Sequence, residues 1–69
     1  MIIQEMIKVT GRGDIIIVEY EDGDYCFKHG DHIYYKNNMW KVTGLEIERL
    51  LTSPSRIGAV VCLAVSKIE

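Results

Sequence analysis

Six glycines divide this chain of 69 residues into short apolar segments, and their spacing constrains the fold more than any other feature. The segments between them are rich in valine, isoleucine and tyrosine, which favour β-strands. Glycine adopts backbone conformations that are closed to other residues, so glycines in these places indicate turns and bulges rather than flexible linkers. The sequence therefore predicts short strands joined by tight turns. The glycines are Gly11, Gly13, Gly23, Gly30, Gly44 and Gly58.

Composition and length indicate a single domain over residues 1–69. The hydrophobic fraction of 48% is enough for a packed core, and the charged fraction of 26% is typical of a soluble surface. The longest run without a charge, residues 57–66, is far shorter than the roughly 20 residues that a membrane-spanning helix needs. The N-terminus has no basic region followed by a long apolar run, so we expect a cytoplasmic protein without a signal peptide and without a membrane partner.

The two cysteines, Cys26 and Cys62, agree with a reducing compartment. Free cysteine is among the most buried residue types, so we expect two buried thiols. A disulfide or a reactive thiol is the alternative.

The local pattern predicts six or seven strands and almost no helix. Turn chemistry at 21–24 separates the runs 14–21 and 25–28, and turn chemistry at 36–38 separates the runs 32–35 and 39–46; Gly44 is expected to form a bulge. Residues 46–51 are the only stretch with helical character, and we expect them to leave the sheet between two strands. The expected strands cover residues 6–10, 14–21, 25–28, 32–35, 39–46 and 58–65.

Four short motifs follow one another in a specific order: Gly11-Arg12-Gly13, Gly30-Asp31, Thr43-Gly44-Leu45-Glu46 and Arg56-Ile57-Gly58. With this order and spacing, roughly residues 5 to 68 resemble the second domain of translational GTPases such as elongation factor Tu. The resemblance implies an all-β fold, a small closed antiparallel Greek-key barrel of six to seven strands, in which Leu50 and Leu51 would cover one end. A small SH3-like or OB-like barrel is the structural alternative.

The same resemblance implies a binding site. Glu46 and Arg49 match family positions that contribute to the pocket for the 3′-terminal adenosine of aminoacyl-tRNA, and the expected surface continues to Arg56. The alternative for Glu46 and Arg49 is a surface ion pair at three-residue spacing. Arg12, between two glycines, either offers its guanidinium to a phosphate or is a solvated turn residue. No Gly-x-x-x-x-Gly-Lys-[Ser/Thr] loop occurs, so we expect this chain by itself to bind no GTP.

No pattern in the sequence predicts catalysis, a cofactor or a metal. There is no Ser-His-Asp arrangement with family-specific context, and no pair of carboxylates in a recognisable pocket motif. Cys26, His29 and His32 offer metal ligands, but their spacing fits no common zinc pattern. The acidic residues between 19 and 24 are expected to form a solvated hairpin tip, with cation binding as the alternative.

The predicted function is a non-catalytic binding module that contacts RNA, the ribosome or a translation-related protein. Lysines interleave with aromatic residues between 25 and 41, as in barrels that stack single-stranded nucleic acid, although the net charge of −2 favours aromatic packing in the core. The alternative function is a self-associating or protein-binding structural barrel. The apolar start of the chain, Met1-Ile2-Ile3, favours such oligomerisation.

Overall fold

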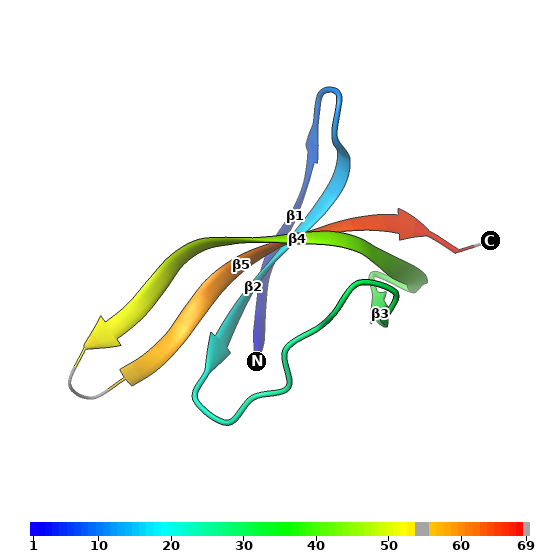
Figure 1. The fold of residues 1–69 in the computed structure, drawn as a ribbon. Coiled ribbons are helices and arrows are strands. Elements are labelled where there is room, and N and C mark those ends of the chain that lie inside the picture. The colour runs from blue at the N-terminus through cyan, green and yellow to red at the C-terminus, as the bar shows by residue number, and fades with distance from the viewer. Residues whose placement is uncertain (54–55, 69) are drawn as a thin grey trace.

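The computed structural model describes residues 1–53 and 56–68, with the backbone alone at residues 53 and 56. These residues form one antiparallel sheet whose five strands have the order β1-β2-β5-β4-β3 (Figure 1). The prediction of an all-β, antiparallel fold is therefore confirmed. The strands are β1 (Ile2–Val9), β2 (Gly13–Glu21), β3 (His32–Tyr35), β4 (Asn38–Ser53) and β5 (Arg56–Lys67).

The sheet is an open half-barrel. In the described ranges β1 and β3 are its two edges and do not pair with each other, and the molecule extends 42 Å in its longest direction. The prediction of a closed barrel with six to seven strands is wrong. The connectivity of β2 to β5 is nevertheless that of a Greek key, because β3, β4 and β5 follow one another and β2 lies beside β5.

Two segments account for the missing closure. Residues 25–28, expected as a strand, belong to a loop that runs from the end of β2 to β3 (Figure 1). Residues 46–51, expected to leave the sheet, instead continue β4, which is 16 residues long. Leu50 covers no barrel end, since 65% of its surface is exposed.

β4 contains two irregularities in its pairing with β5. The register shifts between Val42 and Gly44, which confirms the predicted bulge, and again between Ile47 and Arg49. At the first shift the Thr43 hydroxyl donates a hydrogen bond of 3.2 Å to the carbonyl oxygen of Ala64. A bulge inserts one extra residue and bends its strand, so β4 curves along its length.

The tight turn predicted at 36–38 is present between β3 and β4. Lys36 and Asn37 have positive φ angles of 50° and 63°, the conformation that a two-residue hairpin turn requires. The turn between β1 and β2 uses Gly11 and Gly13 in the same region, with φ of 82° and 80°. The turn expected at 21–24 is also present, where β2 ends.

The core covers one face of the sheet, here called the core face. The loop over residues 22–31 passes over this face, and Phe27 packs against the core. The Phe27 N–H donates a 2.9 Å hydrogen bond to the hydroxyl oxygen of Tyr20, which ties the loop to β2. The buried cluster consists of Ile16, Val18, Tyr20, Ile33, Trp40, Val42, Val61, Leu63 and Val65.

The aromatic residues divide between core and surface. Tyr20 and Trp40 are buried, and the Trp40 indole N–H donates to the carbonyl oxygen of Tyr35 at 3.0 Å. Tyr25 and Tyr34 are 61% and 63% exposed, so core packing explains only part of the set. No helix in residues 1–53 and 56–68 is long and apolar enough to cross a membrane.

Candidate functional site

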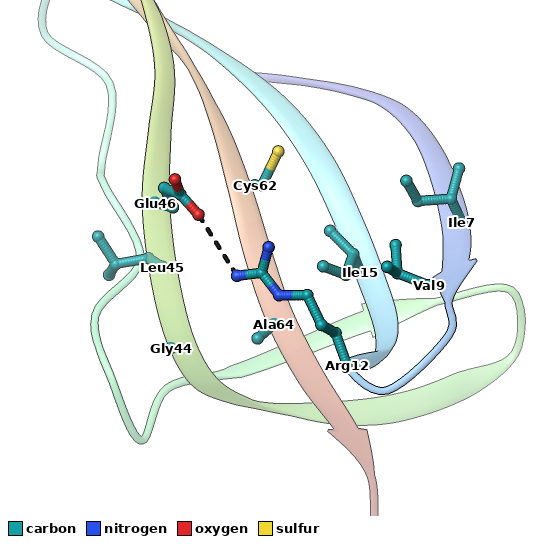
Figure 2. Close-up of a pocket in the computed structure, with 9 residues that line it drawn as sticks. All are labelled: Ile7, Val9, Arg12, Ile15, Gly44, Leu45, Glu46, Cys62 and Ala64. Atoms are coloured by element: carbon teal, nitrogen blue, oxygen red, sulfur yellow. Dashed lines mark hydrogen bonds and ion pairs between the residues drawn. The ribbon is translucent and has the colours of Figure 1, made fainter.

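The structure brings together two of the residues that the sequence predicted to bind a partner. The β1–β2 turn places Arg12 so that its side chain crosses the face opposite to the core face, here called the outer face (Figure 2). Its Nη2 lies 3.3 Å from Oε2 of Glu46 on β4. Both side chains are largely exposed, at 62% and 69%, so the ion pair contributes little to stability.

A shallow groove of about 510 Å³ lies beneath this ion pair on the outer face. Small residues of β4 and β5 form its floor, and β1 supplies an apolar wall. The groove is therefore apolar below and charged at its opening. The lining residues are Ile7, Val9, Arg12, Ile15, Gly44, Leu45, Glu46, Cys62 and Ala64.

Cys62 is only partly buried and Cys26 is exposed, so the expectation of two buried thiols is wrong; both are free. Burial raises the pKa of the Cys62 thiol, and the carboxylates of Glu48 and Glu46 raise it further. The Cys62 Sγ lies 3.9 Å from Oε2 of Glu48. A raised pKa keeps the thiol protonated and weakly nucleophilic at neutral pH, which argues against a reactive cysteine here.

The other two predicted site residues, Arg49 and Arg56, belong to the β4–β5 hairpin, which also carries Glu46. Arg49 lies on β4 opposite Val60, and Glu46 lies opposite Cys62, so both point to the outer face. Arg56 begins β5, but its side chain lies outside the described residues.

The acidic residues near the end of β2 include a structural tie. The Asp24 carboxylate accepts a hydrogen bond of 2.9 Å from the Glu21 N–H and lies 2.7 Å from the N-terminal ammonium group of Met1. That ammonium group, followed by the Glu21 N–H, lowers the pKa of Asp24. Asp24 therefore fastens the end of β2 and the N-terminus. Within the described residues there is no group of three His, Cys, Asp or Glu side chains that could hold a metal ion.

One edge of β4 is unpaired over most of its length, a feature that the sequence analysis did not identify. β3 pairs with β4 only from Asn38 to Lys41, and the loop adds two backbone hydrogen bonds at Val42. These run from the Gly30 N–H to the Val42 carbonyl, 2.7 Å, and from the Val42 N–H to the Asp31 carbonyl, 2.8 Å. Beyond Val42, no strand of the described structure pairs with this side of β4 (Figure 1).

Exposed apolar side chains follow the unpaired edge on the core face. Leu45, Ile47 and Leu50 are 49%, 57% and 65% exposed, and Ile57 on β5 is 64% exposed. We call these four residues the β4 apolar row. The apolar row adjoins a second groove of about 440 Å³. Phe27 also lines this groove and belongs to the loop over residues 22–31, which we call the crossing loop. A contiguous apolar surface beside a free strand edge is typical of a site where another chain binds.

A signal that residues 45–48 form a strand was present in the sequence. Residues 45–48 read Leu-Glu-Ile-Glu, an alternation with the period of two that marks a strand with one apolar face. The helical character of the glutamates and leucines outweighed that alternation in the sequence interpretation.

Charged side chains segregate along the sheet, although no basic block exists in the sequence. Lys41 lies opposite His32 in the β3–β4 ladder, and Tyr34, on the same face as His32, is largely exposed. Glu19 and Glu21 of β2 and Glu46 of β4 lie further along the sheet, whereas Asp14 of β2, opposite Val65, lies at the same end as Lys41 and Lys67. Basic and imidazole side chains on β3, on the adjoining turn, loop and β4, and at the end of β5 are Lys28, His29, His32, Lys36, Lys41 and Lys67.

Comparison of this chain with family models, with curated proteins and with solved structures finds no match. The fold and the surfaces described above therefore carry the functional argument.

Proposed function

We propose that this chain is a non-catalytic binding module that recognises an extended polypeptide segment, which adds to the sheet as a strand along the free edge of β4. The observation that carries this proposal is the unpaired edge from residue 43 to residue 53 beside the β4 apolar row. In strand addition, backbone hydrogen bonds supply affinity and pockets for alternate side chains supply specificity. β4 offers both.

The direction of the β4 backbone groups supports this proposal. The N–H and C=O of Val42 point toward β3, and Val42 lies on the core face. Along a strand, the direction of these groups alternates together with the side-chain face. Leu45, Ile47 and Leu50 are on the core face, so their N–H and C=O groups point to the free edge. Each therefore offers a backbone donor and acceptor next to an apolar side chain.

A peptide display library tests this proposal without a known partner. We expect selected peptides to alternate apolar and polar residues and to lose binding to the Ile47→Lys variant. The matched control is Ile2→Lys, which alters a similarly exposed isoleucine, 53% against 57%, on the opposite edge strand. Failure to select any peptide, or selection of peptides that bind both variants equally, would overturn the proposal.

A second candidate function, RNA binding, is favoured by the basic end of the sheet. Tyr34 is exposed, and Lys41 and His32 are cross-strand neighbours, so an aromatic surface lies beside positive charge. Proteins that bind single strands combine such rings with basic side chains. The resemblance to translational GTPases points to RNA as well, but through Arg12, Glu46, Arg49 and Arg56.

Binding of single-stranded oligoribonucleotides at low salt separates these two surfaces. Binding at the basic end predicts affinity that falls steeply as salt rises and weakens in Tyr34→Ala and Lys41→Glu. Binding at the positions implied by the resemblance predicts weakening in Arg49→Ala instead. Absence of binding at low salt would exclude RNA as the ligand.

A further inference from the structure

We propose that the segment that occupies the free edge of β4 is β4 of a second copy of this chain, paired antiparallel about a two-fold axis. This inference rests on the proposed function, because it names the partner that the free edge binds. The resulting dimer joins two half-barrel sheets into one continuous sheet. The sequence of the edge and the second bulge in β4 both favour this pairing.

The second bulge places opposite charges on one face. Glu46 and Arg49 are three residues apart, a separation that puts side chains on opposite faces of a regular strand. The register shift between Ile47 and Arg49 adds one residue, so that Glu46 lies opposite Cys62 and Arg49 opposite Val60 on β5. Cys62 and Val60 are two residues apart and share a face. Glu46 and Arg49 therefore both point to the outer face.

The edge of β4 is complementary to itself in the antiparallel direction. When Glu46 of one copy lies opposite Arg49 of the other, the two-fold axis repeats the same pair in reverse, which gives two opposite-charge pairs. The same register places Leu45 opposite Leu50 of the second copy, also twice. Cross-strand pairs of opposite charge and of apolar side chains stabilise a sheet. A slip of one residue places Glu46 opposite Glu48, where like charges repel.

Backbone geometry agrees with this register. Leu45 and Leu50 lie on the core face, as their partners Leu63 and Ala59 on β5 show, so both direct their N–H and C=O groups to the free edge. They form a hydrogen-bonded cross-strand pair. Glu46 and Arg49 direct theirs to β5 and form a non-hydrogen-bonded pair, in which side chains of the two strands lie closest. The charged side chains of the two copies therefore face each other at the positions where cross-strand side chains are closest.

The dimer also covers two residues of the β4 apolar row. Leu45 and Leu50 are each about half or more exposed in the single chain, and each gains a leucine neighbour from the second copy. Isologous pairing of this kind closes the assembly at two subunits, because each chain has one free β4 edge. A closed dimer leaves no free β4 edge for further association.

Charge exchange combined with molar-mass measurement tests this proposal. We expect the chain, of 7.9 kDa, to have twice that mass by light scattering as its concentration rises from micromolar to millimolar. Glu46→Lys and Arg49→Glu alone each place two like-charge pairs in the dimer, and we expect each to raise the dissociation constant about tenfold. The double variant restores the pairs and recovers dimerisation. An equimolar mixture of the two single variants also recovers it, as heterodimers that native mass spectrometry identifies.

Recovery of dimerisation in the mixture would exclude a merely structural effect of the substitutions, because each chain in the mixture still carries the substitution that weakens its dimerisation when that variant is alone. Glu5→Lys on β1 is the matched control and leaves the dissociation constant unchanged. A monomer at every concentration that still binds display-selected peptides through Ile47 would overturn the second copy as partner and leave the proposed function standing. A monomer that binds no peptide would overturn both. A dimer unaffected by either charge reversal would overturn this register.

Discussion

Gly58 lies so close to the backbone of Tyr20 that a β-carbon at position 58 would overlap the carbonyl oxygen of Tyr20. The two residues belong to the paired strands β5 and β2, near the place where β2 ends. Gly58 therefore has a steric role, in contrast to the turn glycines, which have positive φ angles. A side chain at position 58 would therefore force β5 and β2 apart where β2 ends.

Gly58→Ala is expected to lower the free energy of unfolding by about 3 kcal/mol or to prevent folding, because the neighbour is backbone and cannot move aside. Gly44→Ala is the matched control, since the nearest atom to its added carbon, the Ala64 Cβ, lies at an ordinary contact distance of 3.8 Å. Urea unfolding followed by circular dichroism measures both. Equal stability of the two variants would contradict the close approach.

Tyr20→Phe is expected to lower the free energy of unfolding by about 1–2 kcal/mol, because the Phe27 N–H loses its acceptor in a partly buried position. Tyr34→Phe removes a hydroxyl from a largely exposed ring and should leave stability unchanged. Thermal unfolding of the two variants gives the comparison. If both unfold at the wild-type temperature, the Tyr20 hydroxyl does not hold the crossing loop.

The crossing loop should also make stability depend on pH. The Tyr25 hydroxyl donates a hydrogen bond of 2.5 Å to Asp31, and the Lys28 N–H donates another of 3.0 Å; these lower the pKa of Asp31, the Tyr25 bond most. A carboxyl whose pKa is lower in the folded state stabilises the fold above its unfolded pKa, ordinarily 3.8. That stabilisation is lost as the pH falls through the lowered value.

Tyr25→Phe is therefore expected to raise the pKa of Asp31 toward its ordinary value and to reduce the loss of stability in acid. Nuclear magnetic resonance titration of the Asp31 carboxyl carbon measures the first effect, and melting temperatures below about pH 5 measure the second. An unchanged Asp31 titration in Tyr25→Phe would show that this hydrogen bond does not form in solution.

Arg12→Ala is expected to change the free energy of unfolding by less than about 0.5 kcal/mol, because the pair with Glu46 is exposed on both sides and screened by salt. Unfolding at low and high ionic strength should give nearly the same difference between variant and wild type. A decrease in the free energy of unfolding several times larger than this would mean that the ion pair organises the outer-face groove.

The sequence predicted the local features of this fold better than its closure. Turns at 21–24 and 36–38 and the bulge at Gly44 followed from residues whose backbone preferences are local. Closure depends on which strand edges meet in space, and that was inferred from a resemblance alone. Residues 46–51 show the difference: glutamate and leucine favour helices weakly, and pairing with β5 along the hairpin overrides that preference.

The candidate site was only partly predictable for the same reason. Arg12 and Glu46 were identified as site residues, but their contact across 34 residues follows from the order of strands. The free edge of β4 depends on how short β3 is, which no local pattern encodes. Its self-complementary charges depend on a bulge between Ile47 and Arg49 that no glycine marks.

Amide hydrogen exchange along β4 tests the central claim, that its free edge accepts a strand. In dilute protein the amides of Leu45, Ile47 and Leu50 should exchange fast, and those of Glu46 and Arg49, which point to β5, slowly. Saturation with a selected peptide should protect the first three amides, and a concentration at which the dimer forms should protect those of Leu45 and Leu50; both should leave Glu46 and Arg49 unchanged. Protection confined to β1 or β3, with Leu45, Ile47 and Leu50 still exchanging fast, would contradict the claim.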